Sequence, residues 1–191
     1  MALPATDTFT GTNGDPLSGN WTVLDGGFSV QSNRIEGTIA ETNAAFWDAD
    51  SFADDQYAQA TIHPNAGAWN QGVLVRSAAP CVGYLALAST ATTLAILRLD
   101  GLETYVNLQT LSGLSPALAD GDLLRLVVVG ARLRVFVNGV QKGTDSTDST
   151  YASGSAGILC YGVSAGRLDN FEADNTGPGT RRVRARWRRH R

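Results

Sequence analysis

The sequence predicts an all-β fold in which two antiparallel sheets pack against each other. The clearest evidence is the segment 123–140, LLRLVVVGARLRVFVNGV, in which two apolar runs flank Gly130-Ala131. A two-residue type II′ turn there, with glycine first, pairs the runs into a hairpin. An antiparallel hairpin with one apolar face needs a second sheet to cover that face. The apolar face of this hairpin pairs Val128 with Leu133, Leu126 with Val135, and Leu124 with Val137.

Two further observations favour the same fold class. The strand-like segments are short and are separated by turn residues, and no segment keeps an apolar period of 3.6 residues. In the first third, the expected strands are 7–11, 21–24, 28–31, 34–38, 44–49 and 56–63. The later expected strands outside the hairpins are 72–76, 83–88, 157–162 and 168–172. Asn138-Gly139 predicts another hairpin turn.

A second hairpin is predicted around Asp100-Gly101, a dipeptide typical of type I′ turns. This turn would place Leu99 opposite Leu102. It would also pair Arg98 with Glu103 across the strands, and Tyr105 would share that mixed face.

Length and composition fit one large domain with a basic tail. The chain has 191 residues, of which 43% are hydrophobic, and 21 glycines. We expect one sandwich over residues 1–174, a linker over 175–180 and an arginine-rich arm over 181–191. The first residues lack a basic start and an apolar run, so no secretory signal is expected, and no apolar stretch is long enough to span a membrane. Cys81 and Cys160 match no zinc or redox spacing, and reduced, buried thiols are favoured over a bridge.

The net charge of −3 hides a strong asymmetry between the body and the arm. Seven of the fifteen basic residues are arginines of the arm, which leaves eight basic against eighteen acidic residues in the body. Such a division indicates a partner for the arm. The residues expected to contact that partner are Arg181, Arg182, Arg184, Arg186, Trp187, Arg188, Arg189 and Arg191.

The arm alternates arginines with Val183, Ala185 and Trp187, a period of two that is typical of a strand. It could add to the sheet edge of a neighbouring subunit, with the arginines meeting an acidic surface. The alternative is a disordered basic tail that binds nucleic acid without specificity.

Several short motifs recur along the body at the predicted strands and turns. They are Asp7-x-Phe9, Trp21, Gly26–Val30 (GGFSV), Gly72–Arg76 (GVLVR), Tyr84, Asn138-Gly139 and Asp169-Asn170-Phe171. In this order they resemble the concanavalin A-like lectin/glucanase superfamily. The resemblance covers residues 5–174 and implies a two-sheet jelly roll, a fold found in lectins, glycosidases, laminin-G-like modules and many phage virion proteins. Because the fold hosts enzymes, sugar binders and structural proteins, function has to be argued from sites.

The sequence argues against an enzyme. Retaining glucanases of this superfamily carry a Glu-x-Asp-x-Glu strand that places two carboxylates on one face. The four glutamates here, Glu36, Glu41, Glu103 and Glu172, form no such motif. The body's histidine, His63, lies in no nucleophile motif and is expected to be a strand-end residue.

Metal and sugar sites are the remaining candidates. Asp48, Asp50, Asp54 and Asp55 cluster in DADSFADD and could hold calcium, although a solvated turn is favoured and no cofactor is expected. For a glycan, Trp69 and Asn70 in a Gly/Asn/Gln loop offer an indole for stacking and an amide for hydroxyls. Tyr105 and Phe136 are the secondary candidates.

Together these observations predict a non-enzymatic structural or binding protein of a phage virion, most simply a capsid decoration or other surface protein. Its expected partners are other copies of itself or a major capsid or tail protein, with nucleic acid only through the arm and no membrane. Location in the virion agrees with the absence of a signal. The alternative function is a lectin-like carbohydrate-binding module that recognises a surface glycan.

Overall fold

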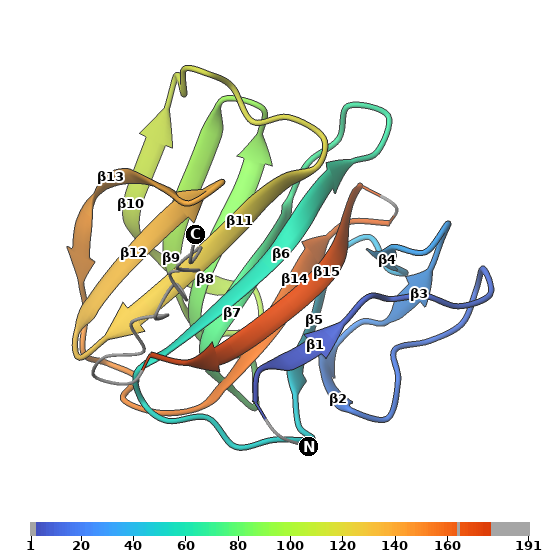
Figure 1. Ribbon diagram of the computed structural model, residues 1–191, viewed down its shortest axis with the longest axis horizontal. Coiled ribbons are helices and arrows are strands. Elements are labelled where there is room, and N and C mark those ends of the chain that lie inside the picture. Colours follow the sequence, from blue (N-terminus) through green and yellow to red (C-terminus); the bar gives the residue numbers. More distant parts are fainter. Residues whose placement is uncertain (1–2, 164, 177–191) are drawn as a thin grey trace, which may run out of the picture.

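The computed structural model describes residues 3–163 and 165–176, and these form two antiparallel sheets packed face to face (Figure 1). The predicted all-β sandwich is therefore confirmed. No helix in this described part is long and apolar enough to cross a membrane. The arm over residues 181–191 lies outside the described residues.

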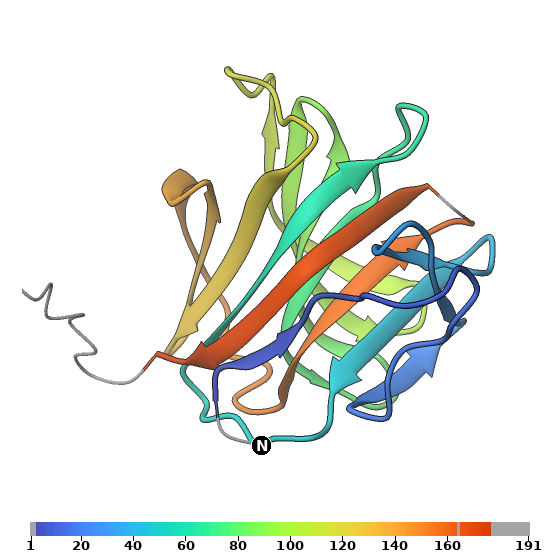
Figure 2. The ribbon, with the colours of Figure 1, turned by 45° about the vertical axis from the view of Figure 1, so that its right-hand side comes forward.

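Sheet A lies in front in Figures 1 and 2, and sheet B lies behind it. The strands of sheet A, in spatial order, are β13 (Val140–Thr147), β12 (Arg132–Val137), β11 (Asp122–Val129), β6 (Gln56–Pro64), β15 (Gly166–Asn175), β4 (Ile35–Gly37) and β3 (Phe28–Val30), and β1 (Ala5–Asp7) also pairs with β15. The strands of sheet B are β10 (Thr104–Ser112), β9 (Thr93–Gly101), β8 (Val82–Thr90), β7 (Gln71–Ala78), β14 (Ser155–Tyr161), β5 (Thr42–Trp47) and β2 (Trp21–Asp25).

The β11–β12 hairpin has the register that the sequence predicts. Leu126 lies opposite Val135, and both side chains are fully buried. Gly130 has a φ of +55° whereas Ala131 has no positive φ, as a type II′ turn requires. At the β12–β13 turn, Asn138 and Gly139 both have positive φ, which fits a type I′ turn.

The core between the sheets is closed at one end by aromatic side chains. Trp21 contacts Phe9, Trp47 and Phe171, with ring centroids 4.7–5.9 Å apart. The Trp21 indole Nε1 also donates a 2.9 Å hydrogen bond to Asp7 Oδ2, so its polar atom is satisfied although the ring is buried. The motif residues that carry the family resemblance are thus mainly core residues.

The predicted register of the β9–β10 hairpin is wrong. The chain reverses at Leu102-Glu103 rather than at Asp100-Gly101, and Tyr105 lies opposite Leu99. Arg98 holds Asp100 through two hydrogen bonds of 2.8 and 2.9 Å, so this aspartate stays in the strand. The predicted ion pair between Arg98 and Glu103 is therefore absent, and Tyr105 shares a face with Leu97 and Leu99.

Candidate functional site

The outer face of sheet B carries a second apolar cluster, separate from the core. Side chains alternate along β8 and β9, so Tyr84 and Ile96 enter the core while their neighbours face outward. The outer face of an antiparallel sheet is usually polar and solvated. Here the outward leucines are largely buried because sheet B curls around them. They are Leu85 and Leu87 on β8, Leu97 and Leu99 on β9, and Leu159 on β14.

A cavity of about 470 Å³ opens above this cluster, and we call it the sheet B cavity. Its floor consists of Leu85, Leu87, Ala95, Leu97, Leu99 and Leu159. We call its polar and aromatic lining residues the rim; they are Thr42, Asn70, Ser89, Glu103, Thr104, Tyr105, Asn107 and Tyr161. An apolar cavity of this size with a few polar groups at its mouth is typical of a small-ligand site.

Glu103 shows how strongly sheet B curls. It lies at the tip of the β9–β10 hairpin, near one edge of the sheet, yet its Oε1 accepts hydrogen bonds from Thr42 on β5. The hydroxyl of Thr42 is 2.5 Å from that oxygen, and its backbone N is 3.3 Å away. Three strands, β8, β7 and β14, lie between β9 and β5 in the sheet. The bond therefore bridges the cavity from one side to the other.

Two exposed tyrosines stand at the rim. Tyr105, on β10, is 62% exposed, and Tyr161, at the end of β14, is 42% exposed. Tyr161 faces outward like Leu159 because Cys160 between them enters the core. Exposed tyrosine rings offer an apolar face and a polar hydroxyl to a ligand. Tyr161 was not among the predicted site residues, although its alternation with Ile158 and Cys160 placed it on the outward face.

Of the predicted glycan-binding residues, Tyr105 and Asn70 meet at the sheet B cavity. Two backbone hydrogen bonds hold Asn70 in place. Its N–H donates to Ala88 O, and its carbonyl oxygen accepts from the Tyr161 N–H; both distances are 2.8 Å. Trp69 points the other way, into the core, and is only 9% exposed. The expectation that its indole is available for stacking is wrong, since Asn70 turns outward and leaves Trp69 inside.

Phe136 lies on the opposite side of the molecule. It is half-buried on the outer face of sheet A, where it pairs with Arg125. Arg125 itself stacks over the Tyr57 ring at 3.6 Å from its centroid. Phe136 therefore belongs to a different surface from Tyr105 and does not contribute to the cavity.

The predicted aspartate cluster is dispersed into local contacts. Asp48 accepts from the Thr22 hydroxyl, Asp50 from the Trp47 indole, and Asp55 from the Gly130 backbone. The carbonyl oxygen of Asp54 accepts from Arg76 Nε at 2.8 Å. Within residues 3–163 and 165–176, no three His, Cys, Asp or Glu side chains gather as a metal site.

The cavity lining does not supply a pair of carboxylates. Among the described residues that line it, the one acidic side chain is Glu103. Glu36 instead pairs with Arg167 at 2.6 Å, and Glu172 accepts a 2.6 Å hydrogen bond from Tyr57, both on sheet A. Glycoside hydrolysis needs two carboxyl groups flanking one bond, and the lining residues do not provide that arrangement.

Cys81 is the one thiol at the cavity. Burial raises its pKa to about 11, and the charges of Asp25 and Glu103 act in the same direction. The thiol is therefore protonated and unreactive at neutral pH. Cys160 faces the core on the other side of sheet B, and both cysteines are free and buried, as the sequence favours.

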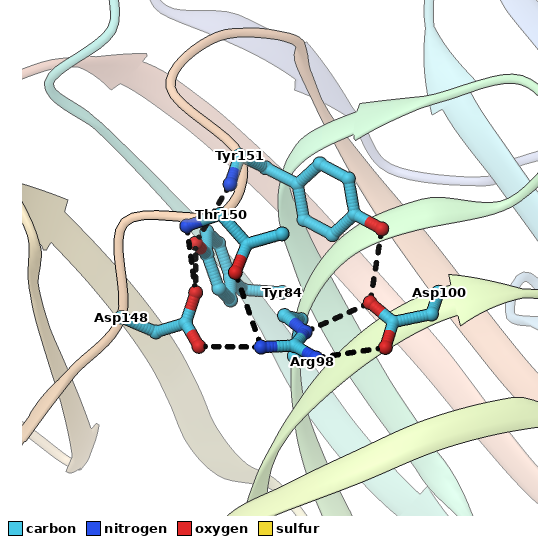
Figure 3. A network of polar contacts seen from close by, with 6 residues as sticks. All are labelled: Tyr84, Arg98, Asp100, Asp148, Thr150 and Tyr151. Carbon is cyan, nitrogen blue, oxygen red and sulfur yellow. Dashed lines mark hydrogen bonds and ion pairs between the residues drawn. The ribbon is translucent and has the colours of Figure 1, made fainter.

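A polar network holds β9 from behind the cavity (Figure 3). Arg98, between Leu97 and Leu99, binds Asp100 through two nitrogens and donates to Asp148 Oδ2 at 2.9 Å. Asp148 also accepts from the Tyr84 hydroxyl at 2.8 Å. Thr150 and Tyr151 complete the network, so the loop between β13 and β14 is tied to β8 and β9.

The network keeps its aspartates ionised. Burial raises the pKa of Asp148, but hydrogen bonds from Thr150, Tyr84 and Arg98 outweigh it and bring that pKa to about 2. Hydrogen bonds from Arg98 likewise lower the pKa of Asp100. Burial raises the pKa of Tyr84 to about 12, so its hydroxyl stays a donor. β9 is thus fixed on the face opposite to the cavity.

Comparison with known proteins shows similarity in structure alone. No protein-family model matches the chain, and neither does any curated protein. The carbohydrate-binding module CBM66 from Bacillus subtilis superposes with a TM-score of 0.68 at 15% identity, over 82% of this chain and 96% of that one. The exoplasmic/lumenal domain of VIP36, bound to Ca²⁺ and Man3GlcNAc, superposes with a TM-score of 0.57 at 12% identity, over 84% of this chain and 86% of that one.

A legume lectin-like domain from Entamoeba histolytica gives a TM-score of 0.52 at 14% identity, over 83% of this chain and 91% of that one. These three structures are two-sheet lectin-like sandwiches, and they match nearly the whole described body. The predicted resemblance is confirmed for the fold. We conclude that this chain has the concanavalin A-like jelly-roll fold.

Proposed function

We propose that this chain is a non-enzymatic carbohydrate-binding domain and that the sheet B cavity is its binding site. The observation that carries the proposal is the cavity itself, about 470 Å³ in volume, with two exposed tyrosines and several polar side chains at its rim. Support also comes from the fold, which this chain shares with a carbohydrate-binding module and a glycan-bound lumenal domain.

The rim residues have the chemistry that a sugar requires. A pyranose ring has apolar faces, which stack on aromatic rings, and a circumference of hydroxyls, which need hydrogen-bond partners. Tyr105 and Tyr161 supply rings, and the amides of Asn70 and Asn107 supply donors and acceptors. The Glu103 carboxylate, anchored by Thr42, supplies a charged acceptor, which makes a stronger hydrogen bond than a neutral one.

The test is glycan binding by the full chain and by matched variants. A glycan array identifies the sugar, and calorimetry with that sugar measures affinity. Tyr105→Ala and Tyr161→Ala should each weaken binding about tenfold, because each removes a stacking surface. Phe136→Ala, on the outer face of sheet A, is the control and should leave affinity unchanged. Equal loss in all three variants, or no loss in the tyrosine variants, would contradict the proposal.

Other predicted partners and the location stay predictions. The names of the three reported structures describe a binding module, a lumenal domain and a lectin-like domain, and none refers to a virion. The virion location rests on several sequence features together and stays a prediction, and so do the capsid, tail and nucleic-acid contacts, which involve the arm outside the described residues. Calcium stays the less favoured alternative that the sequence left open: VIP36 is named as Ca²⁺-bound, but the aspartates here engage in local contacts.

A further inference from the structure

The floor of the sheet B cavity offers nothing to a hydroxyl group. Its six side chains are five leucines and Ala95, none of which has a hydrogen-bonding atom. Cys81, beside them, has a thiol that burial keeps protonated, and a thiol is a weak donor. Four of the five leucines are at most 7% exposed, so the floor is a closed apolar surface.

The hydroxyl groups of a sugar are unfavourable in this part of the cavity. Any hydroxyl pressed against the leucines loses its water without gaining a partner, and each such loss costs about 1–3 kcal/mol. The polar side chains lie at the rim instead, where Glu103 meets Thr42 and where Asn107 stands opposite Leu97 on the neighbouring strand. A ligand that matches the whole cavity therefore has one polar part and one apolar part.

We propose that the glycan bound by this chain carries a hydrocarbon substituent, an alkyl or acyl chain, which occupies the floor while the sugar occupies the rim. This inference rests on the proposed function, because it assigns the substrate class of the same cavity. The cavity volume of about 470 Å³ corresponds to roughly sixteen waters at their share of liquid volume. A hydrocarbon chain displaces poorly bonded water from the leucines.

The size of the effect follows from apolar transfer. Burying one methylene group tightens binding about fourfold. Affinity should therefore rise by about that factor for each methylene added to the substituent, and the rise should stop when the floor is filled. Burial of apolar surface also makes the heat-capacity change of binding more negative with each step.

The experiment is calorimetry on the full chain with methyl, butyl, hexyl and octyl glycosides of glucose, galactose and mannose, below the concentrations at which micelles form. The matching 6-O-acyl sugars show whether the hydrocarbon is carried at the anomeric position or as an ester. A rise in affinity of about fourfold per methylene in either series, for the preferred sugar, is the expected result. Equal affinity for the methyl and the octyl compounds would overturn the inference.

Two variants locate the effect in the floor. Ala95→Phe fills the cavity from β9, and Leu87→Asn places an amide on a half-buried floor position of β8, which gives a second route if the larger side chain impairs folding. Both should reduce the gain per methylene. Val140→Phe, on exposed β13 of sheet A, is the matched control and should retain it. Retention of the full gain in both floor variants would overturn the inference.

The outcomes separate this inference from the proposed function. If methyl glycosides bind with sugar preference and the chain length has no effect, the hydrocarbon assignment fails and glycan binding stands. If alkyl chains bind equally well on every sugar and on an ethylene glycol head group, the glycan assignment fails in both proposals. If none of these compounds binds and no glycan on the array binds, both proposals fail.

Discussion

Replacement of Tyr84 by phenylalanine tests the network that supports β9 behind the cavity. The Tyr84 side chain is fully buried, donates to Asp148 Oδ1 at 2.8 Å and accepts from the Tyr151 backbone N–H at 3.0 Å. Tyr84→Phe keeps the ring and removes the hydroxyl. The Tyr151 N–H then loses this partner, and Asp148 loses one of the hydrogen bonds that stabilise its charge.

The expected cost is about 2 kcal/mol, in the range for an orphaned buried donor. For a domain of this size, that cost lowers Tm by about 4–8 °C. Differential scanning calorimetry and urea unfolding measure it, with Tyr105→Phe as the matched control. Tyr105 is 62% exposed, so its hydroxyl is solvated and the control should change stability by less than about 0.5 kcal/mol. A Tyr84→Phe protein as stable as the control would refute the account of the network.

Three further predictions concern acid, thiols and the cavity bridge. The folded-state pKa of Asp148 is about 2, below its ordinary value of 3.8, so its contribution to stability is full above pH 4 and is lost as the pH falls through 2. Urea unfolding from pH 6 to pH 2.5 should show that loss, and Asp148→Asn should show less of it; equal acid sensitivity in both proteins would contradict the assignment. Burial raises the pKa of Cys81 to about 11 and that of Cys160 to about 12, so a thiol reagent at pH 8 should label neither in the folded protein and both in urea. Rapid labelling of the folded protein would argue against buried thiols. Thr42→Val removes the hydroxyl that bonds Glu103, so amide hydrogen exchange at residues 101–104 should accelerate while exchange in the β11–β12 hairpin stays unchanged. Unchanged exchange in both segments would show that the bridge does not hold the β9–β10 tip.

The two hairpins show what the sequence determines and what it leaves open. In β11–β12, one face is aliphatic and the other contains arginines, so a single register satisfies the pattern. In β9, Leu94 and Ile96 enter the core while Leu97 and Leu99 enter the cavity floor. Because both faces of β9 carry apolar residues, a shifted β9–β10 register would still place apolar residues on both faces, and the hydrophobic pattern does not select one register. The predicted register of this hairpin therefore rests on the turn preference of Asp100-Gly101 alone, and that prediction is wrong because the chain reverses at Leu102-Glu103.

The candidate site was predictable only in part, for a related reason. The sequence selects Asn70 as an amide in a loop and Tyr105 as an aromatic residue on the mixed face of a hairpin, but the curl of sheet B that brings them to one cavity is a tertiary property. Glu103 and Thr42 are 61 residues apart, and no local pattern indicates that they bond. The exposure predicted for Trp69 is wrong because loop composition indicates exposure, whereas the burial of the indole in the core depends on how the two sheets pack.

The most direct test of the central claim is an amide chemical-shift titration of the full chain with the glycan that the array selects. The account predicts that the shifted amides cluster around the sheet B cavity, at residues 97–107 of β9 and β10 and at Leu159 and Tyr161 of β14, while β11 and β12 stay unshifted. Shifts concentrated on the outer face of sheet A around Phe136, or no saturable shifts with any array hit, would contradict it.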